Sequence, residues 1–420
     1  MIINKKLLLI ILGSSLEYYD FVLYGLLANY ISKAFFPITN STTQLIQSFS
    51  IFTLGYLIRP ISGTILGIIA DKYSNIRVFS FSILLMGIAT LSIGLIPSYS
   101  AVGIISVFLL AASRMIQGIS FASELPGAIT ILGNSYFSTH VPISSSIGYL
   151  MASTSFGSIA ASLIVYLLHI ILTERQILDW GWRLPFILGG ILAAISYYIR
   201  RSLENSEELK SPSHRKAKES TISFLFNIFI CDYKLIAQGI GITSLIAAGT
   251  IFLFYLPHYL ELHFVFDTTE IKLYSFIGML TFAVFSILFG SFLERINFQK
   301  FFIKVAAAFP ILIYLLILEA KLIGGSLSLF IFFFFYEICM AALFISGLRI
   351  LSQLFSHSHR TTSISLCYNL SFSIFSLSPI FINYLILITN MVESACIFFL
   401  ILSTASVSIL ITNLDRRLHI

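Results

Sequence analysis

Charged side chains are scarce in this sequence, and long polar stretches are almost absent. Asp, Glu, Lys and Arg make up 10% of the 420 residues, hydrophobic residues make up 57%, and the mean hydropathy is +0.94. A soluble domain carries about 25% charged residues, and no single soluble core buries so much apolar surface. The apolar runs are long and nearly unbroken, whereas the strands of a membrane barrel alternate over about 10 residues. The composition therefore predicts an all-α integral membrane protein.

Clustered cysteines and catalytic motifs are lacking as well. The four cysteines lie far apart without metal-ligand spacing, so we interpret them as small apolar residues. We find no nucleotide-binding loop, no helix-borne His-Glu-His zinc set and no nucleophile elbow. We therefore expect no cofactor, no metal and no enzymatic activity. The formal net charge of +6 indicates membrane topology and not a nucleic-acid partner.

Twelve apolar runs are each long enough for a helix of about 20 residues that crosses a bilayer. The first run continues past its acidic residues without a small-residue cleavage site, so we interpret it as an uncleaved helix and not as a signal peptide. The predicted spans are 8–34, 45–70, 77–97, 100–130, 143–171, 183–201, 234–260, 271–293, 300–318, 323–349, 362–388 and 391–413.

One hydrophilic segment, 202–221, follows the sixth run. Its sequence, "SLENSEELKSPSHRKAKEST", has no apolar period and contains Ser-Pro, which is typical of a linker. We therefore predict a six-helix bundle over 1–203, a linker over 204–223 and a second six-helix bundle over 224–420. Most lysines and arginines fall on the side of the membrane that holds the linker, so we expect the linker and both termini in the cytoplasm.

Two acids stand close together in the first predicted span. Glu17 and Asp20 are three residues apart and share one helix face, which Tyr24 continues. An ionisable residue in the hydrocarbon costs about 2.5–3.5 kcal/mol on insertion scales. Desolvated carboxylates this close do not both ionise easily, so we expect one of them to take up and release a proton. The alternatives are a helix-end pair wetted by the cytoplasm, or a pair neutralised by an arginine. Arg59, next to Pro60 in the second span, would either pair with these acids or bind substrate.

A second polar cluster lies in the span 100–130. Arg114 is one turn before Gln117, and Gln117 and Glu124 are seven residues apart, so the three lie on one face. The functional interpretation is the wall of a polar site. Arg114 would bind a carboxylate there, and Glu124 would carry a proton or face a substrate ammonium. The alternative is a structural bridge between Arg114 and an acid of the first span.

A short pattern occurs once in each half of the chain. The stretches "GIIADK" (67–72) and "GSFLER" (290–295) both read glycine, three residues, acid, base. Each follows the second span of its half, which indicates a duplicated architecture. Glycine allows neighbouring helices to approach closely. We expect Asp71 to stand at the start of the third helix, where the backbone dipole is positive.

Further stretches carry a resemblance over the whole chain. They are "LEYYDFVLYG" (16–25), "RMIQGISFASELPGA" (114–128), "WGWRLPFILGG" (180–190) and "RTTSISLCYNL" (360–370). Together with the twelve spans and the repeated loop, they resemble the major facilitator superfamily. Within it they resemble the metabolite:proton symporter branch, whose members carry proline and betaine, 2-oxoglutarate, citrate or shikimate. The chain departs from the family pattern at Glu294, where an aspartate is usual, and at Ala122 and Ser123, where glycines are usual.

The resemblance implies a fold of two pseudo-symmetric six-helix bundles that work by alternating access. It assigns the loop residues to gating of the cytoplasmic side, and these are Gly67, Asp71, Lys72, Gly290, Glu294 and Arg295. It also suggests a site or gating role for Tyr368 and Asn369, although helix capping and packing explain these two residues equally well.

We therefore expect a proton-coupled importer of a small polar solute, with a proline- or glycine betaine-like zwitterion as the leading substrate. Its partners would be protons, the substrate and the lipid bilayer. The importer would be a monomer in a bacterial inner membrane. Protons would be carried by Glu17, Asp20 and Glu124. Substrate would be bound by Tyr24, Arg59, Arg114, Gln117, Tyr368 and Asn369.

Two other functions stay open at this point. The first is a proton-coupled symporter of a dicarboxylate or tricarboxylate such as 2-oxoglutarate or citrate, for which Arg59 would supply a second arginine. The second is a sensor that kept the fold and lost transport, which the altered loop motifs suggest. The span 143–171 lacks the Gly-Pro signature of drug/proton antiporters, which disfavours an exporter.

Overall fold

The computed structural model describes residues 5–36, 41–133, 141–204, 232–264, 266–356 and 358–417. Within these ranges, twelve helical spans are long and apolar enough to cross a membrane. The predicted all-α membrane fold with twelve spans is therefore confirmed. Contacts between Cα atoms divide the chain into two units, one of Met1–His140 with Ser153–Ala217 and one of Val141–Ala152 with Lys218–Ile420.

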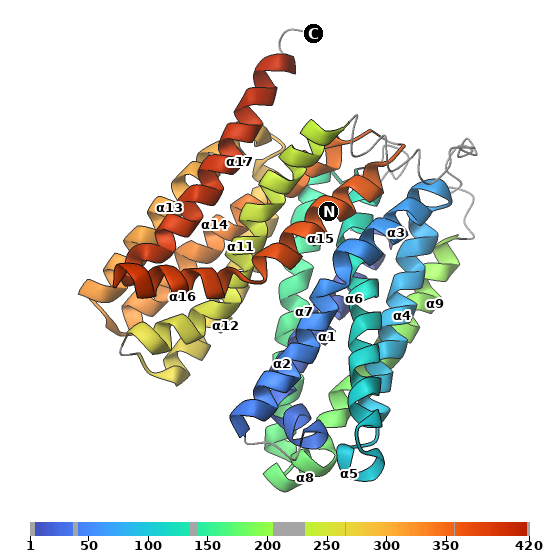
Figure 1. Ribbon diagram of the computed structural model, residues 1–420. Coiled ribbons are helices and arrows are strands. Elements are labelled where there is room, and N and C mark those ends of the chain that lie inside the picture. The colour runs from blue at the N-terminus through green and yellow to red at the C-terminus, as the bar shows by residue number, and fades with distance from the viewer. Residues whose placement is uncertain are drawn as a thin grey trace. The chain divides into compact units, whose positions relative to one another are not determined.

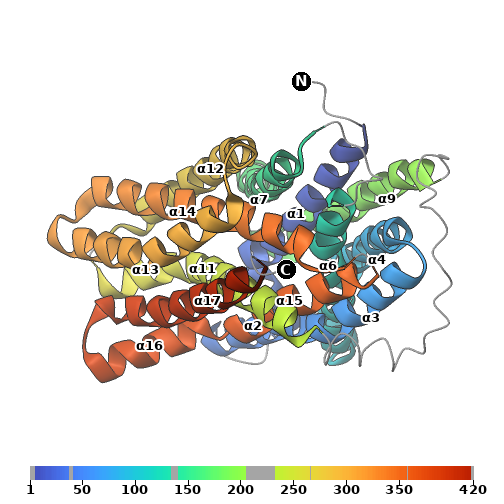
Figure 2. The same cartoon turned by 90° about the horizontal axis from the view of Figure 1, so that it is seen from above.

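The first unit holds the helices drawn in blue to green in Figure 1. They are α1 (Lys5–Phe35), α2 (Ser41–Leu57), α3 (Arg59–Lys72), α4 (Asn75–Leu95), α5 (Tyr99–Val102), α6 (Ile105–Leu132), most of α7 (Ile143–Ile171), α8 (Glu174–Asp179) and α9 (Leu184–Glu204). Helix α4 packs against both α6 and α9, as the view from above in Figure 2 shows.

The second unit holds the first residues of α7, and the rest of its described part begins at Asp232. Its helices are α11 (Tyr233–His263), α12 (Thr268–Phe292), α13 (Phe298–Leu322), α14 (Gly325–Leu354), α15 (Arg360–Phe375), α16 (Ser378–Thr389) and α17 (Ala395–Arg417). Helix α14 packs against α12 and α13, and α11 packs against α15 and α17. Apart from Glu204, the predicted linker 204–223 lies outside the described residues, so the predicted division at that point stays a prediction.

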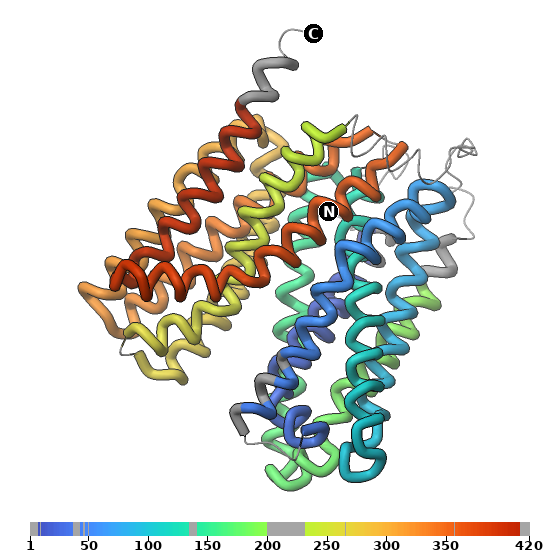
Figure 3. Tube along the Cα trace, in the orientation of Figure 1, coloured from blue at the N-terminus to red at the C-terminus, as the bar shows by residue number. Residues whose placement is uncertain are grey.

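Three predicted spans are interrupted in the structure. The span 45–70 is divided into α2 and α3 at Ile58, because Pro60 lacks the backbone N–H that would continue the hydrogen bonds of one helix. The span 362–388 is divided in the same way into α15 and α16, just before Pro379, and Figure 3 shows the change of direction. The span 100–130 is divided into α5 and α6 at Gly103, whose φ of +61° favours glycine.

Glycines set the closest helix contacts of the first unit. A Cβ atom at Gly118 of α6 would lie 2.2 Å from the carbonyl oxygen of Gly55 in α2. A Cβ atom at Gly157 of α7 would lie 2.0 Å from the carbonyl oxygen of Ser15 in α1. No side chain fits at either crossing, so the two glycines allow backbone to contact backbone. The first crossing holds α2 and α6 together at the level of Arg114 and Gln117.

Candidate functional site

The first unit contains a small cavity between α1, α2, α3, α4 and α6. Its lining residues are Asp20, Phe21, Phe52, Gly55, Tyr56, Arg59, Met86, Arg114, Gln117, Gly118 and Phe121. Four of the polar residues expected at the site, Asp20, Arg59, Arg114 and Gln117, are therefore brought together. Each of these four side chains is at most 5% exposed. Buried charged groups at such a depth mark a functional site or a structural ion pair.

Gln117 connects the acid and one arginine of this cavity. Its side-chain oxygen accepts a hydrogen bond of 2.6 Å from Nη1 of Arg114. Its side-chain nitrogen donates to Oδ2 of Asp20 and, at 3.0 Å, to the hydroxyl of Thr90 in α4. The amide therefore joins three helices, α1, α4 and α6, through one side chain.

The guanidinium of Arg114 lies over an aromatic face. Its Cζ is 3.6 Å from the ring centroid of Tyr24, and that ring is stacked on Phe52 at 5.6 Å. The hydroxyl of Tyr24 donates to the backbone oxygen of Ser48 at 3.0 Å, which fixes the ring. A cation over an aromatic face is stabilised by about 2 kcal/mol or more when water is excluded. Tyr24 thus positions Arg114, whose guanidinium covers one face of the tyrosine ring.

Arg59 is held in a similar aromatic setting. It is the first residue of α3, and its Cζ lies 3.8 Å from the ring centroid of Phe121 and 4.0 Å from that of Tyr56. The interruption at Ile58 directs this side chain into the first unit. Two aromatic rings thus flank the guanidinium, and the expected pairing of Arg59 with Asp20 or Glu17 stays a prediction.

Several polar atoms of the cavity have no hydrogen-bond partner within the described part of the chain. They are Nε and Nη2 of Arg114, Nε of Arg59 and Oδ1 of Asp20. A buried donor or acceptor that is left unpaired costs about 1–3 kcal/mol. Three N–H donors near one another favour a ligand with acceptor oxygens, above all a carboxylate, which arginine binds with two parallel hydrogen bonds.

Two other predicted acids are buried but do not line the cavity. Glu124 accepts a hydrogen bond of 3.0 Å from the hydroxyl of Ser82 in α4. Gln117 also contacts α4, so the two residues face the same helix, as their spacing predicts. Glu17 is 2% exposed in α1 and lies one turn before Asp20. The structure therefore places one acid of the predicted pair, Asp20, in the cavity lining.

The first loop motif differs from its expected position. Asp71 and Lys72 close α3, and α4 begins only at Asn75. The N-terminus of α4 is capped by Ser74, whose hydroxyl accepts a hydrogen bond from the backbone N–H of Arg77. The expectation that Asp71 stands at the start of this helix is wrong, because α3 extends through the motif. Gly67 is buried in the same helix.

The second loop motif contacts the N-terminus of α7 within the second unit. Oε1 of Glu294 accepts a hydrogen bond of 2.6 Å from the backbone N–H of Ser144. A Cβ atom at Gly290 would lie 2.9 Å from the carbonyl oxygen of Ser144, so glycine allows this close approach. A carboxylate is stabilised at a helix N-terminus, where N–H groups are unpaired and the dipole is positive. Arg295 follows in the turn after α12.

Tyr368 and Asn369 belong to the second unit and lie in the interior of α15, since that helix already begins at Arg360. Tyr368 packs against Phe372, with ring centroids 4.4 Å apart. The side-chain nitrogen of Asn369 donates to the backbone oxygen of Ser365 at 2.9 Å. Both residues are buried, so their packing is established, and a role in substrate binding stays a prediction.

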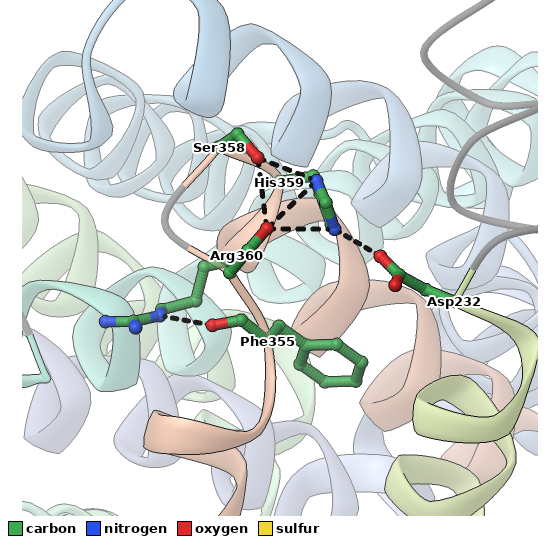
Figure 4. Close-up of polar contacts among 6 residues, drawn as sticks. Asp232, Phe355, Ser358, His359 and Arg360 are labelled. Carbon is green, nitrogen blue, oxygen red and sulfur yellow. Dashed lines mark hydrogen bonds and ion pairs between the residues drawn. The ribbon is translucent and has the colours of Figure 1, made fainter. Parts of the chain in front are cut away.

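A polar cluster at the start of α15 was missed by the sequence interpretation. Figure 4 shows His359 between Asp232, which precedes α11, and Ser358. Nε2 of His359 contacts Oδ2 of Asp232, and Nδ1 lies 2.9 Å from the hydroxyl of Ser358. Nε of Arg360 donates to the backbone oxygen of Phe355 at 3.2 Å. The cluster thus ties the turn between α14 and α15 to the beginning of α11.

Other contributors to the cavity were also missed. Tyr56 precedes Arg59 by three residues and Phe121 follows Gln117 by four, so helical spacing was a usable signal for both. Thr90 does not line the cavity but hydrogen-bonds Gln117, and it lies in an apolar run of α4 without such a signal.

Comparison with known proteins gives relatives and a fold family. A protein of Staphylococcus aureus (strain MSSA476) named "Putative proline/betaine transporter" is 30% identical over 378 residues, which cover 87% of this chain and 78% of that protein. The proline/betaine transporter of Escherichia coli (strain K12) is 31% identical over 288 residues, which cover 64% of this chain and 56% of that protein.

Solved structures share the fold at low sequence identity. The proton:xylose symporter XylE, bound to 6-bromo-6-deoxy-D-glucose, superposes with a TM-score of 0.75 and 14% identity, covering 97% of this chain and 94% of the other. The fucose:proton symporter FucP of Escherichia coli gives a TM-score of 0.64 and 18% identity, with 97% of each chain covered.

The family model described as "Major Facilitator Superfamily" matches residues 10–379, which is most of the chain. The resemblance drawn from the sequence is therefore confirmed. Three findings agree with this family. The described residues hold twelve apolar helical spans, the relatives are named as transporters, and the structures that share the fold are those of transporters. This chain belongs to the Major Facilitator Superfamily and is a multi-pass membrane protein of the secondary transporter type.

Proposed function

We propose that the protein imports a small zwitterion, such as proline or glycine betaine, together with protons. The observation that carries this proposal is the cavity in which Asp20 and two arginines are buried together. The substrate carboxylate would bind the unpaired N–H groups of Arg114. The cationic group would lie near Phe21 and Phe52, which line the same cavity.

Asp20 would carry the proton. It is the acid that lines the cavity, and the N–H of Gln117 holds its carboxylate in place. Protonation of this carboxylate would leave the two guanidinium groups of the cavity with a net positive charge that favours an anionic group of the solute. Glu17 and Glu124 remain second candidates for the same role. The gating role of the two loop motifs, the cytoplasmic position of both termini, the inner-membrane location and the monomeric state belong to the same proposal.

A dicarboxylate such as 2-oxoglutarate is the second candidate substrate. It requires a second arginine in the cavity, and Arg59 lines the cavity beside Arg114. With Asp20 protonated, the two guanidinium groups carry two positive charges that a dicarboxylate would neutralise. The relatives named for proline and betaine favour the zwitterion.

Uptake into proteoliposomes tests the proposal. Radiolabelled proline, glycine betaine, 2-oxoglutarate and citrate are offered with an acidic exterior, an alkaline exterior or no pH gradient. We expect one solute to accumulate only when the exterior is acidic. Equal uptake with and without the gradient would contradict proton coupling. Saturable binding of a solute that is never accumulated would favour the sensor.

A further inference from the structure

Both the nitrogen and the oxygen of the Gln117 side-chain amide form hydrogen bonds with protein neighbours. A glutamine amide has two N–H donors and one carbonyl oxygen. Here the two donors face Asp20 and Thr90, and the oxygen accepts from Arg114. Gln117 was expected to bind substrate, but its hydrogen-bonding groups are directed at these three side chains.

The orientation of this amide is fixed by the chemistry of its neighbours. A guanidinium only donates hydrogen bonds, and an ionised carboxylate only accepts them. While Asp20 is ionised, the amide oxygen must therefore face Arg114 and the amide nitrogen must face Asp20. The opposite orientation would place two donors together at Arg114 and two acceptors together at Asp20.

A proton on Asp20 removes the reason for this orientation. A proton on Oδ2 would face the N–H of Gln117, so that two donors meet. A half-turn of the amide relieves that contact, but it directs the NH2 group at Arg114, which offers no acceptor. A proton on Oδ1 weakens Oδ2 as an acceptor, and Oδ1 itself has no hydrogen-bond partner in the described part of the chain. When Asp20 is protonated, the amide of Gln117 therefore cannot form favourable hydrogen bonds with both Asp20 and Arg114.

We propose that Gln117 is the positioning residue that couples the protonation of Asp20 to the availability of Arg114 for substrate. The inference rests on the function proposed above. When Asp20 is ionised, Gln117 engages Nη1 of Arg114. When Asp20 is protonated, Gln117 releases that N–H group, which then joins the unpaired Nη2 in binding a carboxylate. Proton and substrate therefore favour each other's binding, and this mutual effect is the thermodynamic requirement for symport.

The other titratable or charged side chains around this group bear on the test. Arg59 from α3 and Tyr56 from α2 line the same cavity as Asp20 and Arg114. Glu17 and Tyr24 lie on the same helix as Asp20. Thr90, the third neighbour of the amide, carries no charge and also forms a hydrogen bond with Asp20. Replacing Thr90 by valine therefore removes one hydrogen-bonding neighbour of the amide and of Asp20, but it keeps Gln117 between Asp20 and Arg114.

The test measures the binding of radiolabelled glycine betaine and of 2-oxoglutarate to the purified full-length protein between pH 5 and 9. In the wild type, we expect the affinity for the bound solute to fall about tenfold per pH unit above the pH at which Asp20 loses its proton, as linkage of one proton requires. In Gln117→Met, which keeps the size of the side chain without its hydrogen bonds, the affinity should vary less than about twofold over the same range. Thr90→Val, the matched control, should keep the slope of the wild type.

The outcomes separate this inference from the proposed function. A wild-type slope that persists unchanged in Gln117→Met would overturn the role of Gln117 and leave proton coupling intact. A flat wild-type profile would contradict proton coupling itself. If Gln117→Met does not fold, Gln117→Glu decides, because a second carboxylate beside Asp20 shares its proton and should move the midpoint of the binding profile to higher pH. An unmoved midpoint in that variant would also overturn the inference.

Discussion

The carboxylate of Asp20 and the guanidinium of Arg114 meet on the same side-chain amide, that of Gln117. A charge on one helix is thereby connected to a charge on another without direct contact of the two groups. When the acid is protonated, the amide N–H loses its best acceptor, and the hydrogen bond between the amide oxygen and the base is affected as well. This connection supports a transporter in which proton and solute binding are linked.

The first prediction concerns Asp20. Asp20→Asn keeps the shape of the side chain but has no proton to exchange. We expect it to lose accumulation driven by a pH gradient and to retain exchange of labelled for unlabelled solute across the membrane. Exchange needs binding and reorientation but no net proton movement. Both assays are run in the same proteoliposome preparation.

A control for this variant is Glu261→Gln, which neutralises an exposed acid near the end of α11. It should accumulate solute like the wild type. Accumulation that survives in Asp20→Asn would assign the proton to another acid.

The second prediction concerns the two arginines. Lysine keeps the charge but cannot form two parallel hydrogen bonds with a carboxylate. Arg114→Lys should therefore weaken solute binding by about 10- to 100-fold, which corresponds to about 1.4–2.8 kcal/mol. Binding is measured at low pH, where the affinity is highest.

Arg59→Lys distinguishes the two substrate classes. A zwitterion offers one carboxylate, so this change should affect its binding less than Arg114→Lys does. A dicarboxylate that spans both guanidinium groups would lose affinity to a similar extent in the two variants. Equal losses with proline or glycine betaine as the solute would show that the assignment of their carboxylate to Arg114 is wrong.

The third prediction concerns the crossing of α2 and α6. The methyl group of Gly118→Ala would lie 2.2 Å from the carbonyl oxygen of Gly55, and backbone cannot yield as a flexible side chain does. We expect a loss of about 1–3 kcal/mol in stability, seen as a lower midpoint of thermal unfolding in detergent. Solute affinity should fall as well, because the crossing positions Arg114 and Gln117.

Gly25→Ala is the matched control in α1, since no atom lies within 4 Å of the position that its Cβ would take. Its unfolding midpoint should stay at the wild-type value or rise slightly. Unfolding of Gly118→Ala at the wild-type temperature would contradict a backbone-to-backbone contact between α2 and α6 at Gly118.

The fourth prediction concerns Glu294 and the N-terminus of α7. Glu294→Gln keeps a possible hydrogen bond to Ser144 but removes the charge that the helix dipole stabilises, a loss of about 0.3–2 kcal/mol. If this contact has a gating role, the rate of transport should change by about 2- to 30-fold while equilibrium binding stays within twofold of the wild type.

Glu294→Asp keeps the charge on a shorter side chain and should lie between the wild type and Glu294→Gln. A loss of binding equal to the loss of rate would assign Glu294 to the structure of the binding site and not to gating.

The sequence predicted the helices and the polar residues better than it predicted their partners. Arg114 and Gln117 are neighbours on one helix, so spacing alone brings them together. The contact of Gln117 with Asp20 depends on how α1 and α6 pack against each other, and the residue pattern of neither helix predicts that packing. Asp71 was expected at the start of the next helix, but α4 begins only after its N-cap residue Ser74, and the sequence pattern alone does not locate that boundary.

The most direct test of the central claim measures protons. Proteoliposomes are prepared with equal pH inside and outside and with no membrane potential, and an external pH indicator records the response when solute is added. The account predicts that the exterior becomes alkaline as solute enters, that the signal saturates with solute, and that Asp20→Asn abolishes it. Solute entry into wild-type vesicles without any change in external pH would contradict the claim that Asp20 carries a coupled proton.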